Sequence, residues 1–365
     1  MAKKPSRLLR TVLRRTGLVL LTLVVLCLAV LILGLNLIFN GPSPTARNKL
    51  TMTLIEASAT KWIPALFLGE ETVVKIRTAT GPSLSEDFTD TSVVVIEAAL
   101  SGNTADEWAD CPDGIRIESI QGKTYNAYVM LVRDPSRVYM GISNQDGFST
   151  AIPGKRLNHV MEEEQVLAAI NGGAFFDDSS SGPHVGSIPE GLVFSRGECV
   201  WTSGAPTETS GFAGFNEDHI LVVHKDNITK AQAEELNIRD GCCFGPVLLM
   251  NGEVNMEAYN KVSGWNPRTA IGQRADGTVI FVCIDGRQTS SLGGDYADLI
   301  NIMLEYGAVN ACNMDGGSST VMLYRDSRGL YGEPGQVQII NSYSLLQKEP
   351  RRMPDYWLVL PPEEG

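Results

Sequence analysis

The feature that most constrains this chain is an uncharged, almost wholly apolar run from Leu18 to Phe39. Its 22 residues are enough for a helix to cross a hydrocarbon core of about 30 Å. Six cations and no acid precede it within residues 1–17, which places the N-terminus in the cytoplasm and the remainder outside. We therefore expect a cytoplasmic basic segment (1–17), a single-pass anchor in the cell membrane (18–39) and an extracellular remainder.

A cleaved signal peptide is the alternative interpretation of this run. Signal cores are usually about 7–15 apolar residues long and are followed by small residues at a cleavage site. This run is longer, and no clear small-x-small pattern follows it. Cys27 is preceded by Leu26 rather than by a small residue, so it makes a poor lipoprotein site. The pattern favours an uncleaved anchor.

The charge of the chain excludes one class of partner. The formal net charge is −12, and removal of residues 1–17 leaves 24 basic and 42 acidic residues. Such a surface repels nucleic acid, so we expect no nucleic-acid partner. It also repels phosphate-bearing ligands, unless arginines and backbone N–H groups gather locally.

The remainder divides into a linker and one domain. We expect residues 40–109 to form a stalk or linker, because Pro64 interrupts a helical stretch and residues 82–92 are polar and acidic. From about Asp110, short apolar runs bounded by turn signals predict strands. The candidates are 127–132, 137–142, 166–170, 191–194, 220–224, 247–250, 269–273 and 278–284, with two more around Val309 and Val321.

Two helices are marked by capping residues. Thr229 caps one that runs to Leu236, and Asp295 caps another that stops at Gly307. These patterns predict an α+β domain over residues 110–365, with a mixed, mostly β core and a few covering helices.

One stretch, residues 310–322, combines features of a ligand site. Asp315 closes an apolar run, and Gly316 and Gly317 follow it, with Ser318 and Ser319 beside them. Glycines let the backbone approach a ligand closely, and bare N–H groups near a carboxylate suit a polar or phosphorylated substrate. The alternative is an ordinary tight turn in which Asp315 bonds its own loop.

Three further polar clusters also follow or precede apolar runs. They are Asn171-Gly172-Gly173, Asn266-Pro267-Arg268-Thr269 and Asp285-Gly286-Arg287. Binding and catalytic residues are commonly carried by loops at the ends of rigid strands. Four such clusters, with two carboxylates and two arginines among them, favour an active site over four unrelated turns.

The same clusters, in this order, resemble the phosphodiester glycosidase family. The resemblance runs from about Asp110 to Pro361 and includes Asn171 to Phe176, Gly245-Pro246, Asn251-Gly252, Asn266 to Gly272, Asp285 to Arg287, Ser290 to Gly294 and Asp315 to Thr320. The family usually has Phe where Ala174 stands and Leu where Met314 stands; both changes keep the position apolar.

The resemblance implies hydrolysis of the glycosidic C–O bond of a sugar-1-phosphodiester, here in envelope or exopolysaccharide glycans. Asp315 and Asp285 are the candidate carboxylates for an oxocarbenium-like transition state. Arg268 completes the expected catalytic set by gripping the phosphate bidentately, as Arg287 also can. We expect substrate contacts at Asn171, Gly172, Gly173, Asn266, Thr269, Arg287, Gly316, Gly317, Ser318 and Ser319.

Several alternatives stay open at this point. Arg287 can instead form a salt bridge with Asp285, and Asn171 can cap its own turn. The protein can also be a non-catalytic glycan-binding or exopolysaccharide assembly protein, or a phosphodiesterase that cuts P–O. No cofactor is predicted, although Asp285 and Asp315 leave a divalent cation possible. The sequence leaves the sugar, the disulfide pairing and the oligomeric state open.

Overall fold

The computed structural model describes residues 7–57, 59–77, 84–96, 105–145, 147–176, 186–203, 211–342 and 349–362. The chain forms two units, residues 1–78 and 79–365, called here the N-terminal unit and the main unit. Each is described by itself. The predicted α+β class, mostly β with a few helices and one N-terminal apolar helix, is confirmed.

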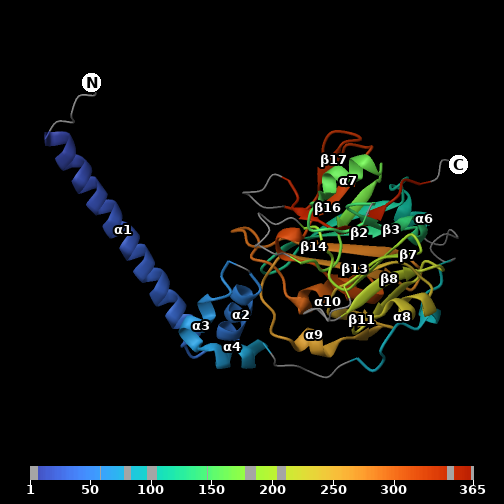
Figure 1. The fold of residues 1–365 in the computed structure, drawn as a ribbon, viewed down its shortest axis with the longest axis horizontal. Helices are drawn as coiled ribbons and strands as arrows, with labels where there is room; N and C mark the ends of the chain where they lie inside the picture. The colour runs from blue at the N-terminus through green and yellow to red at the C-terminus, as the bar shows by residue number, and fades with distance from the viewer. Residues whose placement is uncertain are drawn as a thin grey trace. The chain divides into compact units, whose positions relative to one another are not determined.

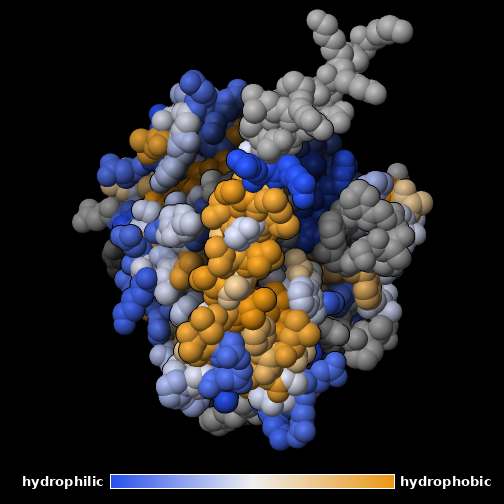
Figure 2. Space-filling model, turned by 90° about the vertical axis from the view of Figure 1, so that its left-hand side faces the viewer, coloured by the Kyte–Doolittle hydropathy of each residue, from blue (hydrophilic) through white to orange (hydrophobic). Residues whose placement is uncertain are grey.

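Among its described residues, the N-terminal unit has one long helix and three short ones. Helix α1 (Arg7–Phe39) contains a stretch, Arg14–Phe39, that is long and apolar enough to span a membrane. Its apolar side chains form the continuous orange column in Figure 2. The short helices are α2 (Pro44–Ile55), α3 (Ile63–Leu68) and α4 (Glu70–Arg77). Residues 40–77 are thus more helical than the expected linker, and Pro64 lies in the first turn of α3, where a proline is tolerated.

The main unit begins before the expected boundary at Asp110. Leu84, Thr89 and Val94 are buried, and the backbone N–H of Thr89 donates to the carbonyl of Val223 at 3.1 Å. The N–H of Val95 donates to the carbonyl of Ala275 at 2.7 Å. Residues 84–92 thus belong to the main unit through buried Leu84 and Thr89, while their acids Glu86, Asp87 and Asp90 are exposed as expected of a solvated acidic segment. Residues 78–83 and 97–104 lie outside the described part of the chain.

The largest sheet of the main unit has seven strands. Its order is β1 (Ile115–Gln121), β2 (Asn126–Val132), β14 (Val279–Ile284), β13 (Arg268–Arg274), β15 (Ala308–Met314), β11 (Val247–Met250) and β12 (Glu253–Val254). All neighbouring strands in it are antiparallel. Asn251 and Gly252 turn β11 into β12, both with positive φ, as the sequence predicts.

Two five-stranded sheets complete the main β structure. One has the order β7 (Glu198–Thr202), β6 (Leu192–Ser195), β10 (Ile238–Cys243), β8 (Phe212–Asn216) and β9 (Leu221–His224). The other has the order β17 (Val337–Ile339), β16 (Met322–Arg325), β5 (Ala168–Asn171), β19 (Asp355–Val359) and β3 (Val138–Ile142). A small pair joins β18 (Arg352–Met353) to β4 (Lys155–Arg156).

The three large sheets enclose one central core, and helices cover their outer faces (Figure 1). Strand β14 shows the alternation: Val279, Phe281 and Cys283 face the central core, while Ile280, Val282 and Ile284 face helix α10 (Tyr296–Glu305). Helix α9 (Met256–Asn260) packs on the same side as α10. Helices α7 (Leu157–Glu163) and α8 (Lys230–Glu235) cover the other two sheets, and α6 (Ala105–Trp108) precedes β1.

The capping predictions are confirmed. Thr229 and Asp295 each form a capping box, and Gly307 ends the α10 segment with φ +78°. The seven cysteines are free thiols in the structure, so no disulfide pairing follows from it.

Candidate active site

Asn171 brings three of the four predicted clusters together. It ends β5 and is fully buried. Its Nδ2 donates to the backbone carbonyl of Asp315 at 2.7 Å, and its Oδ1 accepts from Thr269 Oγ1 at 2.8 Å and from the N–H of Val321 at 3.2 Å. Both ends of the amide are occupied by protein groups. Asn171 and Thr269 therefore position the Asp315 loop, rather than offering free donors to a substrate.

The loop after β15 is held by backbone contacts that only glycines permit. The N–H of Asp315 donates to the carbonyl of Gly172 at 3.2 Å, and the N–H of Gly317 donates to the carbonyl of Pro267 at 2.9 Å. A Cβ on Gly316 would lie 2.7 Å from that same carbonyl oxygen, and Gly317 has φ +62°. Asp315 itself is half-buried. The glycines thus fix the backbone of a partly accessible carboxylate.

Arg287 links the fourth cluster to Asn266 and is exposed. Its Nε and Nη2 donate to Asn266 Oδ1 at 3.2 and 3.1 Å. Its Nη1 lies 3.2 Å from where a Cβ of Gly317 would stand. The guanidinium therefore lies against the backbone of the Asp315 loop. An exposed cation here is placed to attract an anionic group to that loop.

Asp285 follows β14 and is almost entirely buried. Asn341 Nδ2 donates to its Oδ1 at 3.3 Å, and the N–H of Ser342 donates to its Oδ2 at 3.2 Å. Burial raises the pKa of Asp285 to about 6, and these two hydrogen bonds oppose the rise by favouring the charged form. A carboxyl group with this pKa changes charge close to neutral pH, as acid–base groups in active sites do.

Arg268 opens β13, and its guanidinium is turned toward the protein. Only 6 % of the residue is exposed. Nη2 donates to the carbonyl of Gly264 at 2.9 Å, Nε donates to the carbonyl of Gly294 at 3.3 Å, and the guanidinium lies 4.5 Å from the centre of the Tyr296 ring. This geometry favours a positioning role for Arg268 over the bidentate phosphate grip expected from the sequence.

Asp355 is a carboxyl group of this site that the sequence analysis missed. It opens β19, is 1 % exposed, and its Oδ1 accepts from the N–H of Gly173 at 2.7 Å. A Cβ on Gly172 would lie 2.1 Å from that oxygen, so the glycine is required here. Burial raises the pKa of Asp355 to about 7; the Gly173 N–H opposes the rise, and the charge of Asp315 adds to it. Asp355 thus lies under the turn whose carbonyl holds Asp315.

Arg351 was also missed, and it contacts the other side of the loop. Its Nη1 donates to Ser318 Oγ at 3.2 Å, and its guanidinium lies 4.8 Å from the centre of the Phe175 ring. Ser318 is exposed, whereas Ser319 is fully buried. Neither Asp355 nor Arg351 follows a glycine-rich turn; the only sequence signal was a charged pair, Arg351-Arg352, and an acid after Pro354.

No metal-binding cluster is evident among the described residues. In that part of the chain, no group of three or more histidine, cysteine or acidic side chains is arranged to hold an ion. Asp285 and Asp355 instead accept hydrogen bonds from protein donors.

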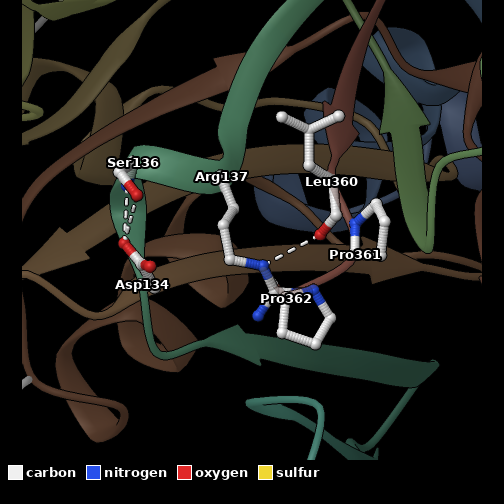
Figure 3. Close-up of a pocket in the computed structure, with 6 residues that line it drawn as sticks. All are labelled: Asp134, Ser136, Arg137, Leu360, Pro361 and Pro362. Carbon is white, nitrogen blue, oxygen red and sulfur yellow. Dashed lines mark hydrogen bonds between the residues drawn. The ribbon is translucent and has the colours of Figure 1, made fainter. Parts of the chain in front are cut away.

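A surface pocket of about 320 Å³ lies elsewhere (Figure 3). Asp134, Ser136, Arg137 and the segment 360–362 line it. Arg137 is tied to the carbonyl of Leu360 through its Nε at 2.8 Å. Leu360 follows the end of β19 opposite to Asp355, about 16 Å of strand away. This pocket contains none of the predicted site residues.

Comparison with known proteins defines the class to which this fold and site belong. The sequence profile of the phosphodiester glycosidases matches residues 164–360, which is more than half of the chain. The chain therefore belongs to the phosphodiester glycosidase family, and family membership supports a glycosidase-type hydrolase function.

Individual relatives are distant. The catalytic domain of zebrafish N-acetylglucosamine-1-phosphodiester alpha-N-acetylglucosaminidase, auto-inhibited by its pro-peptide, has a TM-score of 0.51 at 18 % identity over 77 % of this chain and 97 % of that chain. It shares the fold. An uncharacterized SPbeta prophage-derived protein, YomE of Bacillus subtilis (strain 168), is 26 % identical over 192 residues, 51 % of this chain and 27 % of its own length. The chain thus spans about a quarter of that relative.

Proposed function

We propose that the protein hydrolyses the glycosidic C–O bond of a sugar-1-phosphodiester. The observation that carries the proposal is the Asp315 loop, in which Asn171 holds the backbone carbonyl of the half-buried Asp315 and the exposed Arg287 lies against the backbone. A carboxylate and a neighbouring guanidinium match the two charges of such a reaction, a cationic sugar carbon and an anionic leaving phosphate.

The side chains divide this work. Asp315 stabilises or attacks the developing oxocarbenium ion, and Arg287 and Arg351 bind the phosphate. Asp285 supplies a second carboxylate. Water provides the oxygen of the new sugar hydroxyl, while the bonding electrons and one proton leave with the phosphomonoester. That leaving group is already a good anion, so the reaction depends less on a strong general acid than ordinary glycoside hydrolysis does.

The location and the substrate source belong to the same proposal. Six cations before an apolar span of membrane length support an N-terminus in the cytoplasm and a main unit outside the cell membrane. Sugar phosphodiesters available there belong to envelope or exopolysaccharide glycans. A non-catalytic glycan-binding or exopolysaccharide assembly protein on the same fold is the alternative. It has less support, because a binding protein need not keep two buried acids with raised pKa values.

Hydrolysis in ¹⁸O-labelled water tests the bond that is cut. The full chain in detergent is incubated with a panel of sugar-1-phosphodiesters, and both products are analysed by mass spectrometry. Label in the sugar is expected; label in the phosphate would mean P–O cleavage. Binding measured by calorimetry without any turnover would support the glycan-binding alternative, and repeating the assay with a chelator tests for a divalent cation.

A further inference from the structure

Helix α3 carries an exposed apolar face. All six of its residues are apolar, yet only Pro64 among them is buried. Leu66 is 71 % exposed, and Trp62, at the start of the helix, is 59 % exposed. Residues four positions apart lie on the same side of a helix, so these two large side chains form one surface. Exposed tryptophan and leucine side by side favour a partner that is itself partly apolar.

The position of α3 is fixed by the end of α1. Phe39, the last residue of α1, is 1 % exposed and stacks on Phe67 of α3, with ring centres 5.0 Å apart. The apolar span Arg14–Phe39 has 26 residues, or about 39 Å of helix, against a hydrocarbon core of about 30 Å. If α1 crosses a bilayer, Phe39 stands at its outer boundary. Helix α3 then lies at the level of the lipid headgroups, where tryptophan is enriched.

The charge of this segment is complementary to an anionic lipid surface. Residues 40–77 contain five basic and three acidic residues, whereas residues 78–365 contain 19 basic and 39 acidic residues. Lys61 directly precedes Trp62, and both are exposed. Cations beside an interfacial tryptophan bind lipid phosphates, and the rest of the chain is repelled by them. Charge and apolar exposure therefore select the same surface.

We propose that the face formed by Trp62 and Leu66 inserts into the lipid–water interface of the membrane that α1 crosses. This inference rests on the proposed anchoring and adds a second, peripheral contact with the same bilayer. The apolar side chains enter the interface, Lys61 reaches the phosphates, and α3 is held there by its stack on Phe39.

Tryptophan fluorescence tests the proposal, because Trp62 is the only tryptophan in residues 1–77. The full chain is reconstituted into vesicles of phosphatidylcholine and phosphatidylglycerol, with or without bromine on the acyl chains. Bromolipid should quench part of the emission, and Trp62→Phe should reduce that quenching at least twofold. Trp108→Phe, at a buried position of the main unit, is the matched control and should leave it unchanged.

Substitution of the neighbouring leucine distinguishes contact with lipid from contact with a second copy of the chain. Leu66→Asp should also reduce the quenching at least twofold, whereas Leu330→Asp, at a similarly exposed position of the main unit, should not. A chain that floats with vesicles but shows no Trp62-dependent quenching refutes this inference alone. A chain that does not float refutes the anchoring as well. Unquenched Trp62 together with a dimer that Leu66→Asp dissociates would assign the face to a second copy.

Discussion

Replacing Asp355 by asparagine should make the stability of the main unit less dependent on pH. In the folded protein the pKa of this buried carboxyl group is raised to about 7, from a value of 3.8 in the absence of burial. The folded state therefore holds the proton more tightly than the unfolded state does. Stability from this group is complete below pH 3.8 and is lost as the pH rises through about 7.

The size of the effect follows from the shift. Each pKa unit corresponds to about 1.4 kcal/mol, so ionisation of Asp355 should cost about 4 kcal/mol between pH 4 and pH 8. An asparagine side chain cannot ionise, while its oxygen can still accept the N–H of Gly173. Asp355 Oδ2 has no hydrogen-bond partner among the described residues, and burial of an amide nitrogen in its place carries a desolvation cost. This cost does not depend on pH. The test is therefore the change in the free energy of unfolding with pH, and not its absolute value.

Chemical unfolding of the full chain in detergent, followed by tryptophan fluorescence at several pH values, measures this slope. The free energy of unfolding of Asp355→Asn, relative to that of the parent, should increase as the pH rises. Asp326→Asn is a control of opposite sign: burial alone would raise the pKa of Asp326, but hydrogen bonds from the backbone of Arg328 and Leu330 outweigh it and lower the pKa. A constant difference for Asp355→Asn between pH 4 and 8 would refute the reasoning.

Four further predictions concern the site residues, three on catalysis with a sugar-1-phosphodiester and one on stability. Asp315→Asn should lower kcat by on the order of 10²-fold or more at nearly unchanged KM, as steady-state kinetics will show, because the lost charge acts on the transition state. Arg287→Lys should raise KM, because an ammonium group cannot bind phosphate through two parallel hydrogen bonds. Arg268→Lys should instead lower the thermal unfolding midpoint, because the Arg268 guanidinium donates to two backbone carbonyls. The kcat/KM of the parent should fall about tenfold per pH unit below about pH 6, where Asp285 becomes protonated, and the profile of Asp285→Asn should lack this limb.

Much of the fold could be predicted from apolar runs and turn signals, and two of the missed strands have a physical reason. Strands β8 and β10 contain Gly214 and Gly241, which normally argue against a strand. In the structure these glycines face each other, and a Cβ on Gly241 would lie 2.5 Å from the Phe212 ring. The glycines thus make room for a phenylalanine. Asp240 of strand β10 is also buried. Its burial is tolerated because its carboxylate pairs with Arg239 and accepts the N–H of Met140.

The convergence of the four polar clusters could also be predicted, because each adjoins a strand end. Which side chains face outward could not. In the sequence, Asn171 and Arg287 are equally good candidates for contact with the substrate. In the structure, the Asn171 amide makes three hydrogen bonds within the protein, whereas the Arg287 guanidinium is exposed. The partners of Asn171 lie up to 150 positions away along the chain. Such distant pairings are fixed by strand register, which a single sequence does not reveal.

The site places three carboxyl groups in three different environments, and this difference assigns their roles. Asp315 is partly accessible on a loop, Asp285 is buried with two hydrogen-bond donors, and Asp355 is buried with one. Burial raises the pKa of both groups: that of Asp285 to about 6, with two hydrogen bonds opposing the rise, and that of Asp355 to about 7, with one opposing it and the charge of Asp315 adding to it. Between these values Asp285 is mostly charged and Asp355 mostly neutral. While Asp355 is neutral, no second negative charge lies near Asp315 under the Gly172-Gly173 turn. Ionisation of Asp355 at alkaline pH adds that charge, so it should lower the activity of the site although Asp355 does not touch the substrate.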